Sequence, residues 1–381
     1  MKYHCWREPC MVGEPAGNGL PGKYNGLSMK SIVFNSLGAM DSSVLLPPGP
    51  GRDCNIVDLQ QGKALVITSD PLYINPVFGL ERGTWMGFQI LAADMWAFGV
   101  DPQHAVFSLN LPNILPVEQF HHIWKVLHHE CLKRGISIVS GHTGAYDGCN
   151  FPIIGAGVMF STVAREKFMN AKSIDMNDRV ILVGGPAREA LASLLHVDEK
   201  TGELVHGNKY RDERNKAWDG LSIEHAARIA REVSVVDKDD CEHHVKIMHD
   251  VAEGGVLGAM EEIRAPIGMG LQLDLDSWVA DENENTFLAY YFTKHQIWHA
   301  SGQGALLIVA DQLLAPHIVE ELRDNGERAM IIGKFREGSE YYYKLDGKTI
   351  RYDAASRDPF WPVFLEAGGN QDGISNEYNS R

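Results

Sequence analysis

Hydrophobic and polar residues alternate along the first half of the chain in a way that predicts strands and helices in turn. The run LVITSD predicts a buried strand that ends at Asp70, and apolar residues at helical spacing predict a helix over 82–98. HAVFSLNLP predicts another strand, and an amphipathic pattern predicts a helix over 116–134. The strands ISIVSGHTG and FPIIGAGVMFST follow. Together these elements predict a first domain over 29–165.

The second half repeats the alternation, starting from a buried strand at VILVGG. Strands are expected at GLQLDLD, GALLIVA and RAMIIGKF, and helices over 186–196, 221–233, 254–264 and 312–325. This predicts a second domain over 171–360, and strands alternating with helices indicate the α/β class, with sheets layered against helices.

Three segments lack this periodicity and are expected to lie outside the domain cores. Residues 1–28 are rich in glycine and proline, which predicts a flexible arm. The polar segment 197–220 predicts an exposed insertion, and the polar tail over 363–381 is expected to be disordered.

Composition and charge narrow the kinds of partner. The 381-residue chain has a formal net charge of −15 at pH 7. This disfavours a nucleic-acid groove, which needs a basic face, and an anionic membrane surface. No apolar run is long enough to span a bilayer, and the N-terminus lacks the apolar stretch of a secretory signal. Six scattered cysteines without a CxxC pair are typical of reduced thiols, so we expect a cytoplasmic protein.

Four aspartates stand at the ends of separate apolar runs, each beside glycine or a small residue. They are Asp53, Asp70, Asp94 and Asp250. Carboxylates brought together by folding form an oxygen-ligand site for Mg²⁺ and nucleotide phosphates. For Asp94 the alternative is a solvated helix residue, and for Asp250 it is a helix N-cap. The pattern predicts that Asp70, Asp94 and Asp250 are metal ligands, with Asp53 as a further one.

Three other features are candidates for binding phosphate. Gly254 and Gly255 open a predicted helix whose exposed N–H groups favour an anion, although a tight turn would also need small residues. Lys23 lies between glycines in a loop able to fold over phosphates. Ser69 either adds a hydroxyl ligand or makes a strand-end hydrogen bond.

Seven motifs in order resemble the ATP-dependent enzymes related to aminoimidazole ribonucleotide synthetase. They are GPGRDCNIVD, VITSDPLYINP, AADMWAFGVDP, SGHTGAYDG, NDRVILVGGPA, MHDVAEGGVLGAMEEI and ASGQGALLIVA. The first departs from the family pattern at Arg52, where an acid is usual, and the third at Ala93, where asparagine is usual. Arg52 either binds a phosphate or is an exposed loop charge.

The resemblance implies a two-domain PurM-like fold, in which the N-terminal domain forms a barrel-like core with a second copy. ATP and Mg²⁺ would lie in the cleft on the aspartates, with Asp70 and Asp94 in catalytic roles. The turn Gly141–His142–Thr143 matches a nucleotide- or metal-binding turn. His142 would coordinate metal, hydrogen-bond a substrate oxygen or act as a general base, the alternative being a structural turn histidine.

The resemblance implies an enzyme that uses ATP to phosphorylate an amide or carbonyl oxygen of a small metabolite. Attack by a nucleophile, or dehydration, would follow. The first alternative is a small-molecule kinase resembling thiamine-monophosphate kinase or selenophosphate synthetase. The second is a non-catalytic nucleotide-binding protein, which the departures at Arg52 and Ala93 motivate. A homodimer acting on a small molecule is expected in the enzyme readings, with neither nucleic acid nor membrane as partner.

Overall fold

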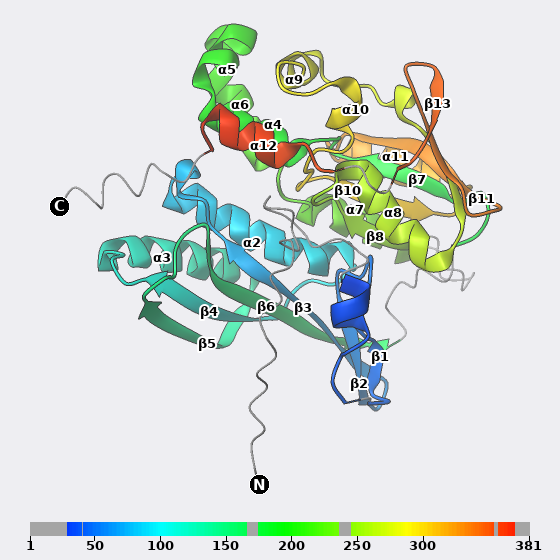
Figure 1. Ribbon diagram of the computed structural model, residues 1–381. Coiled ribbons are helices and arrows are strands. Elements are labelled where there is room, and N and C mark those ends of the chain that lie inside the picture. Colours follow the sequence, from blue (N-terminus) through cyan, green and yellow to red (C-terminus); the bar gives the residue numbers. More distant parts are fainter. Residues whose placement is uncertain (1–28, 40, 166–173, 236–244, 354–356, 370–381) are drawn as a thin grey trace, which may run out of the picture.

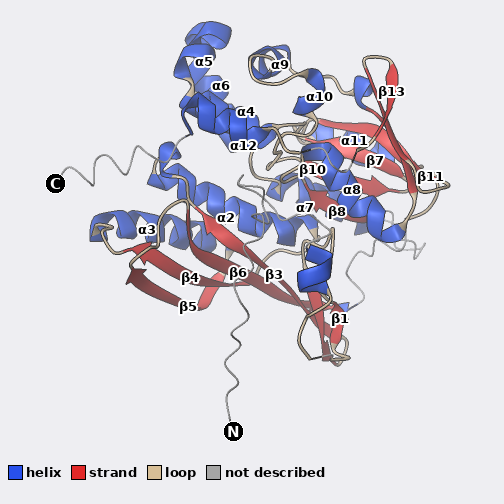
Figure 2. Ribbon diagram, viewed as in Figure 1, coloured by secondary structure: helices blue, strands red, loops and turns tan. Residues whose placement is uncertain are grey.

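Two β-sheets, each packed against helices, make up the protein (Figures 1 and 2). The computed structural model describes residues 29–39, 41–165, 174–235, 245–353 and 357–369. The predicted arm over 1–28, with Lys23, lies outside these residues. The two sheets with their helices confirm the predicted α/β class.

The N-terminal unit is a six-stranded sheet in the order β1-β2-β3-β6-β4-β5. Its strands are β1 (Val44–Leu46), β2 (Asn55–Gln60), β3 (Lys63–Tyr73), β4 (His104–Pro112), β5 (Ser137–Tyr146) and β6 (Ile153–Ala164). Its helical elements are η1 (Met29–Phe34), η2 (Pro76–Phe78), α2 (Leu80–Ala97) and α3 (Val117–Arg134). The two helices α2 and α3 lie together on one face of the sheet, and β5 is an edge strand paired in parallel with β4 (Figure 1).

Local sequence explains where these two helices begin and end. Helix α2 follows Gly79, whose positive φ of 77° turns the chain out of the preceding 3₁₀ turn. Helix α3 begins after Pro116 and ends at Gly135, whose left-handed conformation (φ 70°) closes the last turn. Both helices lie within a few residues of their predicted ranges, because strong apolar periodicity marks a helix reliably.

The C-terminal unit is a seven-stranded sheet in the order β13-β12-β9-β11-β7-β10-β8. Its strands are β7 (Arg179–Val183), β8 (Val245–Asp250), β9 (Gly270–Asp274), β10 (Leu306–Ala310), β11 (Ala329–Arg336), β12 (Tyr341–Leu345) and β13 (Lys348–Arg351). Its main helices are α4 (Arg188–Val197), α7 (Glu224–Val235), α8 (Gly255–Ile267) and α11 (Ala315–Asp324). Further helices are α5 (Glu199–His206), α6 (Tyr210–Asp219), α9 (Glu282–Leu288), α10 (Lys294–Ile297) and α12 (Phe360–Phe364).

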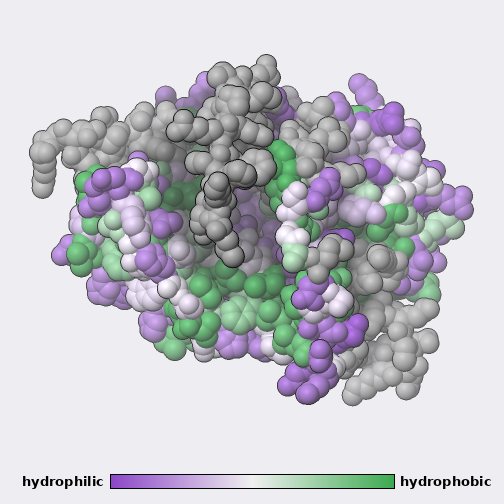
Figure 3. All heavy atoms as spheres, turned by 60° about the horizontal axis from the view of Figure 1, so that its bottom comes forward, coloured by the Kyte–Doolittle hydropathy of each residue, from purple (hydrophilic) through white to green (hydrophobic). Residues whose placement is uncertain are grey.

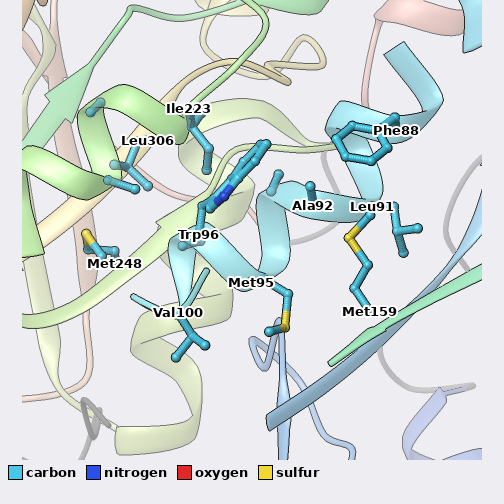
Figure 4. Packing of buried hydrophobic residues seen from close by; sticks show 14 of the residues in the cluster. Phe88, Leu91, Ala92, Met95, Trp96, Val100, Met159, Ile223, Met248 and Leu306 are labelled. Atoms are coloured by element: carbon cyan, nitrogen blue, oxygen red, sulfur yellow. The ribbon is translucent and has the colours of Figure 1, made fainter. Parts of the chain in front are cut away.

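The largest hydrophobic cluster is continuous across the two units. Helix α2 contributes Phe88, Leu91 and Trp96, and the C-terminal unit contributes Met248 and Leu306. The side chain of Trp96 points toward the residues of the C-terminal unit (Figure 4). Because apolar side chains of both units are removed from water together, the packing fixes α2 against the strands that carry part of the site.

The face of the N-terminal sheet opposite α2 and α3 carries exposed apolar side chains. Val139 on β5 is 51% exposed, and Ile153 on β6 is 56% exposed. The view toward that side of the molecule shows apolar residues gathered there (Figure 3). A sheet face with exposed apolar side chains is normally covered by another element, and among the described residues nothing covers this one.

Two segments differ from the sequence prediction. The expected exposed insertion over 197–220 instead forms α5 and α6, in which Tyr210 and Trp218 are buried. The tail expected to be disordered from residue 363 continues as helix to Gly369, and Phe364 is only 1% exposed. In both segments a few aromatic side chains pack against α4, which polar composition alone does not indicate. Residues 370–381 lie outside the described part of the chain.

In the described residues, no helix combines the length and the apolar character needed to cross a membrane.

Candidate functional site

The four predicted aspartates come together from four different elements. Asp53 lies two residues before β2, Asp70 lies near the end of β3, Asp94 lies in the last turn of α2, and Asp250 ends β8. The negative charges of Asp250, Asp70 and Asp53 all act on Asp94. The N-terminal unit therefore supplies three carboxylates of this aspartate cluster, and the C-terminal unit supplies the fourth.

Asp94 occupies the least favourable position of the four for a carboxylate. The C-terminal end of a helix carries partial negative charge, so an acid in the last turn is destabilised there. Burial raises the pKa of Asp94 well above its ordinary value, and the three neighbouring aspartates raise it further. The Thr68 hydroxyl donates a hydrogen bond to Asp94 over 2.5 Å and offsets part of this effect. Asp94 is therefore a carboxylate whose charged form is disfavoured by three neighbouring carboxylates.

His249 joins the two units at the edge of the cluster. Its Nδ1 lies 2.6 Å from the carboxylate of Asp53, and its Nε2 lies 3.1 Å from that of Glu262 on α8. Burial lowers the pKa of His249, but the two carboxylates outweigh burial and bring the pKa well above its ordinary value. His249 is thus a charged imidazole with both nitrogens in contact with carboxylates, and it positions the carboxylate of Asp53.

The donor set fits a divalent cation with a preference for oxygen. Ligand atoms of Asp53, Asp250 and His249 lie within 4.8 Å of one another, but both ring nitrogens of His249 already face carboxylates. The remaining donors are carboxylate oxygens, which Mg²⁺ prefers, keeping several waters as further ligands. A dication would offset the repulsion that the neighbouring carboxylates exert on Asp94.

Cys54 lies beneath the cluster and is fully buried. Its thiol faces the backbone carbonyl of Asp94 at 3.4 Å. Burial raises the pKa of Cys54 well above its ordinary value, and the surrounding aspartates add to the increase. The residue is thus held as a neutral thiol and packs as part of the core, so it is not an activated nucleophile.

The start of helix α8 is occupied by a carboxylate of the chain itself. The Gly254 N–H donates to Asp358 Oδ2 over 2.8 Å, and the Phe360 N–H donates to Asp358 Oδ1 over 2.8 Å. A Cβ atom on Gly255 would lie 2.6 Å from the carbonyl oxygen of Trp298. Gly255 is therefore required for close packing, and the anion-binding position predicted at this helix start holds Asp358.

A second group of acids, which the sequence interpretation missed, surrounds this helix start. Burial raises the pKa of Glu189 to about 7 and that of Asp358 to about 6, and each also feels the charge of Glu253. Ser301 donates a hydrogen bond to Glu189, and Trp361 Nε1 donates to Glu253 over 3.0 Å. Glu189 and Asp358 stand in no motif and are separated by much of the C-terminal unit, so sequence spacing gave no signal.

The remaining predicted residues lie apart from the aspartate cluster. Ser69 is exposed because alternation along β3 turns Thr68 and Asp70 to one face and Ser69 to the other. The hydroxyl that contacts the cluster is that of Thr68, not that of Ser69, which the sequence offered. Arg52 is exposed and donates to the carbonyl of Pro47 over 2.6 Å, as in the loop-charge alternative.

The turn over residues 141–143 lies on the edge strand β5. A Cβ atom on Gly141 would lie 2.4 Å from the carbonyl oxygen of Phe107, so a close backbone approach requires the glycine. His142 is exposed and its Nε2 lies 2.7 Å from the hydroxyl of Tyr146; Thr143 is exposed beside it. Within one chain, neither side chain is placed among the four aspartates.

Comparison with known families identifies the class of protein that this arrangement defines. The N-terminal domain of the AIR synthase related proteins matches residues 51–159, and their C-terminal domain matches residues 177–346. The chain belongs to the AIR synthase related protein family.

Curated relatives carry the name phosphoribosylformylglycinamidine synthase subunit PurL. The protein of that name from Lacticaseibacillus paracasei is 22% identical over 320 residues, covering 79% of this chain and 40% of the relative. The one from Methanobrevibacter smithii is 21% identical over 248 residues, covering 63% of this chain and 33% of the relative. The chain thus spans well under half the length of these relatives.

Solved structures share the fold at low sequence identity. HypE from E. coli, a hydrogenase maturation protein, aligns with a TM-score of 0.62 and 16% identity, covering 88% of this chain and 97% of HypE. Thiamine monophosphate kinase from Aquifex aeolicus gives 0.60 and 15%, covering 85% and 97%. PurL from T. maritima, solved in complex with ATP, gives 0.61 and 15%, covering 86% and 49%. At these identities the likeness shows the fold alone.

Proposed function

We propose that this protein is an ATP- and Mg²⁺-dependent enzyme that phosphorylates an amide or carbonyl oxygen of a small metabolite. Nucleophile attack or dehydration would complete the reaction. The observation that carries the proposal is the convergence of Asp53, Asp70, Asp94 and Asp250 from two units on one cluster, where three of the carboxylates act on Asp94. The PurL structure in complex with ATP, and a thiamine monophosphate kinase structure in complex with AMPPCP, support it.

The four aspartates would hold the metal, with Asp70 and Asp94 nearest to the chemistry. A bound magnesium ion would neutralise charge that develops on the transferred phosphoryl group. Thr68 fixes the carboxylate of Asp94, and His249 fixes that of Asp53. The paired His249 also keeps the loop before β2 against α8, so the N-terminal carboxylates face Asp250. These contacts orient the ligands before any nucleotide binds.

The test is ATP binding and hydrolysis by the full chain, with and without Mg²⁺, beside an Asp70→Asn variant. Asp58→Asn is the matched control, because Asp58 lies on the same sheet but pairs with Arg165. We expect Mg²⁺-dependent release of ADP that falls about 100-fold in Asp70→Asn, by analogy with loss of one electrostatic contact at an active site. Equal turnover in the Asp70→Asn and Asp58→Asn variants would overturn the proposal.

A small-molecule kinase is the second candidate. It is favoured by the thiamine monophosphate kinase structure, whose complex holds AMPPCP and TMP. The two reactions differ in their products, because a kinase leaves a stoichiometric phosphoproduct, whereas phosphorylation followed by attack or dehydration releases free phosphate. Measuring free phosphate against ADP in a substrate screen separates them. ATP binding with no turnover on any substrate would favour the non-catalytic reading.

We also propose that the open face of the N-terminal sheet is covered by a second copy of the chain. The exposed apolar residues on this face and the unpaired edge of β5 support it (Figure 3). His142 and Thr143 lie on that edge strand, so their proposed roles at the site depend on such a dimer. Sedimentation of the wild-type chain against Val139→Lys tests it, with a shift to monomer expected for the variant.

A further inference from the structure

A cavity lies between the two units, apart from the aspartate cluster: Asp53, Asp70, Asp94 and Asp250 do not line it. Its volume is about 470 Å³. Trp85 of α2 contributes one part of the wall, and Val183, Ile223 and Leu306 of the C-terminal unit contribute another. The cavity thus has an apolar wall of a size suited to a small metabolite.

The cations that line this cavity are mostly neutralised by carboxylates. Arg134 pairs with Glu130 and Glu224 at 2.6 and 2.8 Å, and Arg228 pairs with Glu224 at 2.8 Å. Charges paired in this way need no ligand. Arg134 and Arg228 therefore form a polar rim of the cavity and are not available to bind an anion.

Arg188, in the first turn of α4, is a buried cation of this lining with a weaker pairing. It is only 9% exposed, yet its Nη1 has a single long contact, 3.4 Å, with Glu284. Glu284 gives its other oxygen to Arg328 at 2.5 Å, so two arginines share one carboxylate. The Nε of Arg188 has no hydrogen-bond partner among the described residues. A buried guanidinium with an unsatisfied N–H is costly unless another group completes it.

The cavity is shaped around the head of this side chain. Gly220, which also lines the cavity, lies so close that a Cβ atom there would be 1.6 Å from Arg188 Nη2. The φ of Gly220 is −76°, a conformation open to any residue, so its backbone does not require glycine. The missing side chain instead leaves space for the guanidinium at the cavity wall.

We propose that this cavity binds a small organic oxyanion, a carboxylate or phosphate group on an apolar body, through the guanidinium of Arg188. The fork of two N–H groups matches the spacing of two oxygens on either kind of anion. The apolar body would lie against Trp85, Ile223 and Leu306. This inference does not depend on ATP use at the aspartate cluster, because it rests on different residues.

Calorimetric titration of the full chain in EDTA tests the proposal with three probes: inorganic phosphate, phenyl phosphate and benzoate. Without metal the aspartate cluster repels anions, so binding there is suppressed. We expect the two aromatic probes to bind more tightly than inorganic phosphate, and a difference between them shows which oxyanion the site prefers. Failure of all three probes to saturate at about 10 mM, a Kd weaker than most small-metabolite sites, overturns the proposal.

Variants locate the binding at Arg188. Arg188→Met is expected to weaken the best probe about ten-fold or more, and Arg188→Lys by less, since it keeps the charge but loses the fork. Gly220→Ala is expected to weaken it by displacing the guanidinium without straining the backbone. Arg336→Met, which removes an exposed arginine hydrogen-bonded to Gln272, is the control and should bind as wild type.

The outcomes separate this site from the aspartate cluster and from unfolding. Thermal unfolding is measured for every variant. If Arg188→Met does not fold, the affinities of Gly220→Ala and Arg188→Lys for the best probe decide whether the proposal holds. Affinities within two-fold of wild type in the folded variants overturn the proposal. The Asp70→Asn variant should retain oxyanion binding. If this variant no longer bound the oxyanion, the anion site would lie at the aspartate cluster, which would also overturn the proposal.

Discussion

The aspartate cluster and the Arg188 cavity lie at the same end of the C-terminal sheet but differ in the sign of the charged groups that lie close together. Leu306 of β10 pairs with Asp250 of β8 on one side and with Val183 of β7 on the other. Asp250 belongs to the cluster, whereas Leu306 and Val183 line the cavity. One strand therefore separates a region where carboxylates lie close together from a region where two arginines share one carboxylate.

The difference shows how incomplete charge pairing distinguishes a binding group from a structural one. His249 and Arg134 are each held between two carboxylates and complete local networks. Asp94 is crowded by three carboxylates, whereas Arg188 shares its carboxylate partner Glu284 with Arg328. A buried group left in that state is destabilising unless a ligand of opposite charge binds. The predictions that follow test this on the two sides of β10.

The largest effect is expected for Asp94→Asn, which should act in opposite directions on activity and on stability. Removing one metal ligand should lower Mg²⁺-dependent turnover about 100-fold. In EDTA the same variant should melt at a higher temperature than wild type, because a neutral amide replaces a carboxylate crowded by three others. Activity assays and calorimetric melting check the two halves. A lower melting temperature in EDTA would mean that the cluster carries no unrelieved repulsion.

His249→Ala should destabilise the fold by about 3 kcal/mol, because it leaves the carboxylates of Asp53 and Glu262 without their shared partner. Urea unfolding gives the free energy of unfolding. His317→Ala is the control, since His317 is exposed and lies 4.0 Å from Glu321 at a helix surface. If both variants lost an equally small free energy of unfolding, the contacts of His249 would not hold the two units together.

Glu189→Gln tests whether the acids near α8 are held neutral by burial. The folded pKa of Glu189 is raised from 4.5 to about 7, so the folded state binds the extra proton between these values. Wild-type stability is then fully present below about pH 4.5 and declines as the pH rises toward 7. The variant should gain up to about 3 kcal/mol over wild type at pH 8 and little at pH 4.5. An equal difference between variant and wild type at both pH values would contradict this.

Thr68→Val should have the smallest effect, a loss of about 1 kcal/mol, because one hydrogen bond to Asp94 is removed from an otherwise unchanged site. Ser69→Ala, at the neighbouring exposed position, is the control and should be close to neutral. Both are read from urea unfolding. A larger loss for Ser69→Ala than for Thr68→Val would reverse the assignment of the two faces of β3.

The sequence predicted the parts of this fold that depend on local pattern. Apolar periodicity located α2 and α3, and the aspartates at the ends of apolar runs predicted the cluster, because each signal lies within one short segment. The sequence named Ser69 and did not single out Thr68, because which face of the strand meets the cluster depends on what packs against it. His249, Asp358 and Arg188 act through partners more than 80 residues away. No spacing within one motif carries that information.

Asp53 and His249 belong to opposite halves of the chain, and this has a consequence for cutting it in two. The N-terminal half holds Asp53, Asp70 and Asp94, and the C-terminal half holds His249 and Asp250. Two polypeptides divided between residues 165 and 174 would each carry an unfinished site. Metal-dependent activity would return only when the fragments reassociate, which makes the chain a candidate for a split reporter of proximity between two fused proteins.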